Sequence, residues 1–142
     1  ILERPDKIIF LPCLKTHKYA KYTGALKLAV GFTKPSERIK FHLMRLQEKV
    51  AELNSKIKCD LVIMDARKCF ISKGPSKGEV REPNLILASD DRVAIDVEGI
   101  KIIQGFKGNS LKKINPWELP QIKRAIELDI GAKSSFEYQV LE

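Results

Sequence analysis

The sequence predicts an α/β fold in which a layered, mostly parallel sheet is flanked by helices, within a single domain over residues 1–142. Three short apolar runs, at residues 7–12, 60–65 and 84–89, have the length and composition of buried strands. Other segments have the apolar spacing of helices, with steps of three and four residues. The resulting order of elements, β-α-α-β-β-α-α-β, is typical of an α/β layered domain.

The first 60 residues predict a strand, a polar turn and two helices. The strand at 7–12 ends at a proline, and Lys15-Thr16-His17 is expected to form the turn that follows it. A short helix rich in small residues is expected at 23–31. The second helix is predicted by one apolar stripe, which consists of Ile39, Leu43, Leu46, Val50, Leu53 and Ile57.

The remaining residues predict two further buried strands, a loop and a second pair of helices. Residues 66–83 are interrupted by glycine and proline, which favours a long loop with short pieces of strand. After the strand at 84–89, Asp90 or Asp91 is expected to cap a helix. The other expected elements are that helix over 91–104, a turn at 116–120, a helix over 120–130 and a strand over 136–141.

The charge of the chain is basic and unevenly distributed. Its 26 Lys and Arg and 18 Asp and Glu give a formal net charge of +8. The hydrophobic content of 44% argues against disorder. The first 60 residues carry 13 Lys and Arg against 6 Asp and Glu, whereas the rest carry 13 against 12. The basic half could meet nucleic acid, a phosphorylated ligand or an acidic partner, or it could simply be a solvated surface.

The cysteines and the apolar segments bear on the compartment. Cys13, Cys59 and Cys69 form no Cys-x-x-Cys pair, so neither a disulfide framework nor a self-contained zinc or iron–sulfur site is expected. No segment approaches the roughly 20 apolar residues of a membrane span, and no signal peptide is recognisable. We therefore expect a cytoplasmic protein without a membrane partner. Because the chain begins at Ile1 and runs almost directly into a strand, we also expect a fragment or a processed form.

Polar groups follow each of the three predicted strands. They are Lys15-Thr16-His17 after the first, Asp65 at the end of the second, and Ser89-Asp90-Asp91 after the third. If the strands are parallel, these groups converge at one edge of the sheet, where α/β proteins bind ligands. The plainer alternatives are a helix cap for Asp90 or Asp91 and a strand-ending turn for Asp65.

Two histidines and one carboxylate form a candidate metal set. His17, His42 and Asp65 would supply two imidazoles and a carboxylate, a combination that binds divalent metal ions. Their spacing does not require this, because they come from three different elements. A solvated loop residue is the alternative for His17, and a partly buried structural residue is the alternative for His42.

Two further segments have a functional and a structural interpretation. Gly74 to Gly78 is a glycine-bracketed segment with a lysine, which could cradle a phosphate or form a surface turn. Tyr19 and Tyr22, with Lys18 and Lys21 beside them, would suit base stacking on a basic platform. Their spacing would equally place both rings on one helical face against the core.

Several of these pieces, taken together, carry a resemblance. They are the Leu-Pro-x-Leu-Lys-Thr-His17 turn, Thr23-Gly-Ala-Leu-Lys27 with Gly31, Arg38 with His42, Asp65, Gly74-Pro75 with Gly78, and Leu-Ala-Ser-Asp-Asp91 followed by Val-Ala-Ile-Asp96. In this order, from about residue 7 to about residue 131, the chain resembles domain-of-unknown-function family 362. One departure is Leu28, where the family commonly has asparagine after the lysine.

The resemblance carries expectations about length, cofactors and site. Members of the family are typically about twice this length, so the chain is expected to be the carboxy-terminal half. Some members carry ferredoxin-type iron–sulfur modules, but the absence of a cysteine cluster means that no such cofactor is expected within this chain. The resemblance favours a site composed of Lys15, His17, Lys27, His42, Asp65, Asp90 and Asp96.

The leading functional hypothesis is a cleft at the strand ends that binds an anionic small molecule or a divalent metal ion. Lys15 and Lys27 would hold negative charge, and His17 and Asp65 would be the catalytic pair as acid/base and orienting group, or metal ligands with His42. The other expected ligand-binding residues are Thr16, Asp90 and Asp96.

One alternative is an RNA- or DNA-binding module that uses the basic first 60 residues. Another is a redox accessory domain that works with an iron–sulfur module elsewhere. Surface meant to face the other half should be exposed or covered, so we expect a homo-oligomer or pairing with the amino-terminal half.

Overall fold

The computed structural model describes residues 5–36, 38 and 45–141, and it has an α/β fold. His42 lies outside the described residues. The strands are β1 (Ile9–Phe10), β2 (Cys13–His17), β3 (Lys21–Thr23), β4 (Leu61–Phe70), β5 (Val80–Arg81) and β6 (Leu85–Ser89). The helices are α1 (Ala25–Leu28), α3 (Leu46–Asn54), α4 (Arg92–Gln104) and α5 (Pro120–Glu127), with 3-10 turns η1 (Ala29–Phe32) and η2 (Pro116–Glu118).

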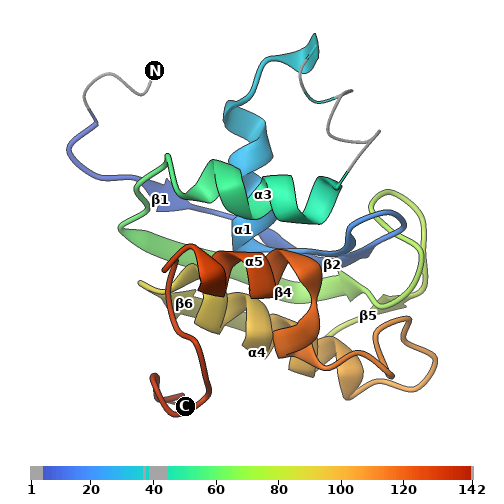
Figure 1. Cartoon of the computed structure of the whole chain (residues 1–142). Coiled ribbons are helices and arrows are strands. Elements are labelled where there is room, and N and C mark those ends of the chain that lie inside the picture. Colours follow the sequence, from blue (N-terminus) through green and yellow to red (C-terminus); the bar gives the residue numbers. More distant parts are fainter. Residues whose placement is uncertain (1–4, 37, 39–44, 142) are drawn as a thin grey trace.

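The long strand β4 is the centre of a mixed sheet that contains all three expected strands (Figure 1). β1 and β2 pair with it in parallel along one side, and β3 continues the sheet as an antiparallel neighbour of β2. β5 and β6 pair with β4 in antiparallel orientation along its other side. The α/β class expected from the sequence is therefore confirmed.

The first strand does not end at its proline, which corrects the expected position of Lys15-Thr16-His17. Pro12 interrupts the ladder, but its carbonyl accepts a hydrogen bond from the Asp65 amide at 2.9 Å, so the chain stays beside β4 and resumes as β2. Lys15, Thr16 and His17 consequently lie in a strand, and the turn is formed by residues 18–20. A proline can lie within an extended segment where its missing donor is not needed.

The direction of β6 corrects the expected convergence of polar groups. β4 and β5 form a hairpin, and the chain continues from β5 into β6 along the same side of β4, so that Val62 pairs with Ser89 and Ala66 with Leu85. A parallel return would need a crossover connection of a dozen or more residues, normally with a helix, and residues 71–79 contain none. Ser89 therefore lies beside the beginning of β4, at the end of the sheet opposite to His17.

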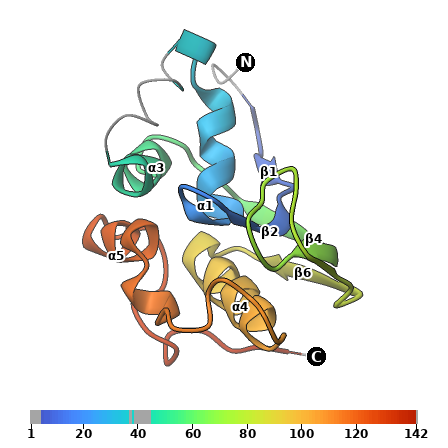
Figure 2. The same cartoon turned by 90° about the vertical axis from the view of Figure 1, so that its right-hand side faces the viewer.

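The helices pack on one face of the sheet, which gives two layers (Figure 2). Buried side chains between the layers include Phe10, Leu14, Met64, Ile100 and Ile122. On the other face, Ile9 and Leu11 are 52% and 66% exposed, and Ile86 is 57% exposed. This second face of the sheet is thus uncovered in the chain as described.

Local sequence signals account for where the helices begin. Asp91, one of the two expected caps, accepts hydrogen bonds from the amides of Val93 and Ala94, which starts α4 at Arg92. The long apolar stripe contributes α3, which begins at Leu46 because Arg45 is left-handed with φ of 50°. Residues 39–44 of that stripe lie outside the described part. None of the described helices combines the length and apolar composition needed to cross a bilayer.

The terminal strand expected over 136–141 does not form. The hydroxyl of Tyr138 donates to Glu98 Oε1 at 2.5 Å, and its ring lies 6.4 Å from that of Trp117, centroid to centroid. These contacts anchor the segment on α4 and η2 instead of in the sheet. The alternation of apolar and polar residues predicted a strand, and this prediction was wrong because Tyr138 is held against α4 and η2.

Candidate anion-binding site

His17 and Thr16 hold the end of β2 through their own side chains. His17 Nδ1 accepts hydrogen bonds from the amides of Tyr19 (3.2 Å) and Ala20 (3.1 Å), so this nitrogen caps the turn and the ring proton lies on Nε2. Thr16 Oγ1 donates to the carbonyl of Phe70 at 3.1 Å, which ties β2 to the end of β4. Both residues are buried, His17 at 7% exposure.

Asp65 lies in the middle of β4 and is engaged by an arginine. Its carboxylate accepts from Arg67 Nε at 3.0 Å and from Nη2 at 2.8 Å, and this fork lowers the pKa of Asp65 to about 2. In the sheet register Asp65 pairs with Cys13, whereas Lys15 pairs with Phe70. Asp65 and His17 are therefore separated along the sheet. Within the described residues there is no group of three or more His, Cys, Asp and Glu side chains placed to hold a metal ion.

The structure separates Asp90 from Asp96. Asp90 is exposed at the beginning of α4, beside the capping residue. Asp96 is completely buried, and its carboxylate accepts from the amides of Ala25 (2.6 Å) and Leu26 (3.0 Å). Asp96 thus anchors the first turn of α1, the short helix that carries Lys27.

Gly24 allows this close approach between Asp96 and α1. A Cβ atom on Gly24 would lie 2.1 Å from Asp96 Oδ1 and 2.6 Å from the Tyr22 ring, distances that no side chain could accept. The sequence Thr23-Gly-Ala-Leu-Lys27 therefore ends β3, begins α1 against the buried carboxylate and places Lys27 in the first turn of α1.

Lys15 on β2 and Lys27 on α1 are two predicted site residues that lie near enough for their charges to interact. Both are half-buried, and the pKa of Lys27 is lowered by burial and by the charge of Lys15. Neither ammonium group forms a salt bridge with any acidic residue that the structure describes. Two neighbouring like charges without a carboxylate create a local positive potential.

Thr23 is a member of this site that the sequence did not reveal. It pairs directly with Lys15 in the β2–β3 register, and directly opposed residues point to the same face of a sheet. Its hydroxyl is buried without a hydrogen-bond partner. The signal that could have found it is the hairpin itself, which would have aligned Thr23 with Lys15, but the expected turn at 15–17 concealed that hairpin.

The tyrosines do not form the expected pair. Tyr22 is buried in β3, where it packs in the core, whereas Tyr19 is 65% exposed in the turn between β2 and β3. Tyr22 lies on the core face of a strand and Tyr19 lies in a turn, so helical spacing applies to neither residue.

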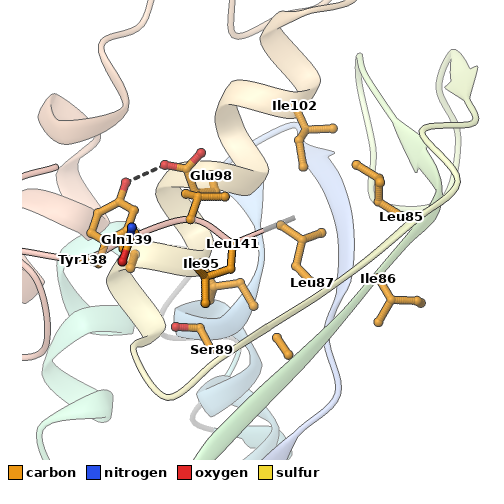
Figure 3. Close-up of a pocket in the computed structure, with 13 residues that line it drawn as sticks. Leu85, Ile86, Leu87, Ser89, Ile95, Glu98, Ile102, Tyr138, Gln139 and Leu141 are labelled. Carbon is orange, nitrogen blue, oxygen red and sulfur yellow. Dashed lines mark hydrogen bonds between the residues drawn. The ribbon is translucent and has the colours of Figure 1, made fainter.

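A groove lies elsewhere, between β6, α4 and residues 138–141 (Figure 3). Its volume is about 830 Å³, and its walls are mostly apolar, with Leu87, Ile95 and Ile102 among them. Glu98 and Tyr138, joined by their hydrogen bond, form a polar wall. Of the polar groups expected at the strand ends, Ser89 lines this groove, whereas Lys15, His17 and Asp65 do not.

The comparison with protein families connects these features to a known group. Residues 1–101 match the family described as domain of unknown function (DUF362). The chain belongs to this family. The match covers most of the chain and includes Lys15, Thr23 and Lys27 as well as Asp65, Asp90 and Asp96, so the lysine pair lies within the DUF362 region. Comparisons with curated proteins and with solved structures gave no match.

Proposed function

We propose that this DUF362 protein binds an anionic small molecule, with a phosphate, sulfate or carboxylate group held between Lys15 and Lys27. The observation that carries this proposal is a pair of half-buried lysines whose ammonium groups form no salt bridge with an acidic residue among those described. Keeping two such charges near each other raises the free energy of the empty site, and a bound anion removes that repulsion. We assign no catalytic step to the site.

The Thr23 hydroxyl supports an oxygen-bearing ligand over a simple halide. A buried hydroxyl without a partner loses the hydrogen bonds that it makes in water, at a cost of about 1–3 kcal/mol. An anion oxygen between the lysines would accept this hydrogen bond, because Thr23 and Lys15 share one face of the β2–β3 pair. Two ammonium groups and one hydroxyl donor suit a tetrahedral oxyanion or a carboxylate.

The test is calorimetric titration of inorganic phosphate into the protein and its variants. Lys15→Gln and Lys27→Gln should each weaken phosphate binding at least about tenfold, since a charge-assisted hydrogen bond contributes roughly 1.5–3 kcal/mol. Thr23→Val, which keeps the shape of the side chain, should weaken binding less, by about fivefold.

The matched control is Lys123→Gln, which removes one positive charge from an exposed lysine paired with Glu118 at 3.4 Å. It should bind phosphate like the unchanged protein. Phosphate binding that survives in the folded Lys15→Gln, Lys27→Gln double variant would rule out the proposed site.

A further inference from the structure

Three loops that are distant in the sequence meet at one end of the molecule. They are the β2–β3 turn with the first residue of β3 (residues 18–21), the β4–β5 loop (residues 71–79) and the loop after α4 (residues 106–113), and we call them together the lysine-rich end. The Lys18 amide donates to the Gly74 carbonyl at 3.4 Å, and the Ser110 amide donates to the Ile71 carbonyl at 2.9 Å. The loops lie at the right of Figure 1 and face the viewer in Figure 2.

The lysine-rich end holds most of the net charge of the chain. Seven lysines lie on the three loops, against one acidic residue, Glu79, so this end carries a net +6 of the formal +8. Glu79 is already paired with Arg81. The lysines, all exposed, are Lys18 and Lys21 on the first loop, Lys73 and Lys77 on the second, and Lys107, Lys112 and Lys113 on the third. None of the seven forms a salt bridge with the acidic residues in the described ranges.

The composition of this surface indicates its partner. Tyr19 is the one large apolar or aromatic side chain that is exposed on the described loops, at 65%, and Lys18 Nζ lies 5.5 Å from its ring centroid. A protein interface normally has a buried apolar centre, and a membrane-binding loop normally carries apolar side chains for insertion. Lysines around a single exposed ring instead suit a nucleic acid, because its phosphates can contact the lysines and an unpaired base can stack on the ring.

We propose that the lysine-rich end binds single-stranded nucleic acid. Its lysines contact the phosphates, and Tyr19 stacks on one unpaired base. None of the three loops contains arginine, the residue that most often reads guanine edges, so binding does not depend on base sequence. A duplex binds more weakly, because its stacked bases leave no ring face for Tyr19. Five of the seven lysines lie beyond residue 60, so this surface differs from one built on the basic first half alone.

The experiment is fluorescence anisotropy of a labelled oligothymidylate of about 20 nucleotides between about 50 and 200 mM salt. Affinity should fall linearly with salt on logarithmic axes. Three double variants, Lys18→Ala with Lys21→Ala, Lys73→Ala with Lys77→Ala, and Lys112→Ala with Lys113→Ala, should each weaken binding and reduce the slope by up to about 1.4. A mixed-sequence oligonucleotide of equal length should bind equally well.

Tyr19 gives a second readout that does not depend on charge. Tyr19→Ala should weaken binding roughly 5- to 150-fold without changing the salt slope, whereas Tyr19→Phe, which keeps the ring, should bind like the unchanged protein. Circular dichroism of every variant checks that the fold is retained.

The charge-matched control is Lys101→Ala with Lys123→Ala, which removes two exposed lysines that are paired with Glu98 and Glu118. This control should bind the oligonucleotide unchanged. Equal weakening by the control would overturn the proposal, because net charge alone would then explain binding. Displacement of the oligonucleotide by polyglutamate as effectively as by unlabelled oligonucleotide would also overturn it. So would binding to phosphatidylserine vesicles with no binding to the oligonucleotide.

Discussion

At the scale of single residues, Asp96 determines where the helix that carries Lys27 begins. Its buried carboxylate accepts from the amides of Ala25 and Leu26, and the Tyr22 hydroxyl also bonds to it. Burial raises the pKa of Asp96 to about 7, since the loss of hydration outweighs these hydrogen bonds and the charge of Arg92. Burial therefore favours the neutral, protonated form of Asp96, the residue that anchors α1.

Asp96 should make the stability of the protein depend on pH. Its pKa is about 3.9 when unfolded and about 7 when folded, so its contribution is fully present below pH 4 and is lost as pH rises through about 7. The free energy of unfolding should fall by about 4 kcal/mol from this group over that range. Urea unfolding of Asp96→Asn should show a flatter pH profile than the unchanged protein.

The difference between the two profiles isolates Asp96 from its neighbours. Burial raises the pKa of Tyr22 above its ordinary value, and Arg92 stays charged throughout, so neither titrates between pH 4 and 8. Parallel pH profiles for the two proteins would contradict this prediction. They would show that Asp96 keeps its ordinary pKa and that its burial does not cause the pH dependence of stability.

Sequence reasoning named two of the three residues of the proposed anion site, Lys15 and Lys27, but not how the residues are arranged. The resemblance placed Lys15, Lys27 and Asp96 in one candidate set, and the structure brings the first two together and buries the third beneath α1. Asp96 and Ala25 are 71 positions apart, and no local pattern reports such a contact. Thr23 was missed because its partner Lys15 was assigned to a turn.

At the scale of elements, the capping residue of α4, Asp91, also binds the segment that follows α5. Asp91 accepts from Val93 and Ala94 at the start of the helix, and it also accepts from the Ala132 amide at 2.6 Å. Gly131, with φ of +95°, lies so close that a Cβ atom there would be 2.4 Å from Asp91 Oδ1. One carboxylate therefore caps α4 and holds the segment that follows α5.

Asp91→Ala should destabilise the protein by about 2–4 kcal/mol. The change removes the helix cap and leaves the Ala132 amide without its acceptor. Asp91→Asn, which keeps one acceptor oxygen, should cost less. Asp90→Ala is the matched control, because Asp90 is the adjacent exposed aspartate, and it should change stability by less than about 0.5 kcal/mol. If thermal unfolding shows that Asp90→Ala destabilises the protein as much as Asp91→Ala or more, the assignment of Asp91 as the cap is wrong.

The elements that the sequence predicted correctly are those with a local physical cause. The apolar runs became β1, β4 and β6, and the aspartate before residues 91–104 capped α4. The errors concern pairing between distant segments. The direction of β6 depends on the β4–β5 hairpin, and the extension of β2 beyond Pro12 depends on its contact with β4. The segment 136–141 failed as a strand because Tyr138 is held by Glu98 and Trp117.

At the scale of the whole molecule, the topology separates groups that the sequence suggested would meet. Antiparallel β6 places Ser89 at the beginning of β4, while parallel β2 places His17 beyond its end. The same topology gathers three loops into the lysine-rich end and sets Lys15 on β2 beside Lys27 on α1. The α/β class could be predicted from periodicity, but the location of the positive charge could not, because it depends on how the loops meet.

The central claim, that Lys15 and Lys27 together bind an anion, is tested most directly by NMR titration of the Lys27 Nζ group with and without inorganic phosphate. Without phosphate, the pKa of Lys27 should lie below that of an ordinary lysine, and Lys15→Gln should raise it by removing one of its two causes. Phosphate binds the protonated form, so it should raise the pKa of Lys27, and phosphate affinity should fall as pH rises through the lowered value. A pKa of Lys27 that saturating phosphate leaves unmoved would contradict the account.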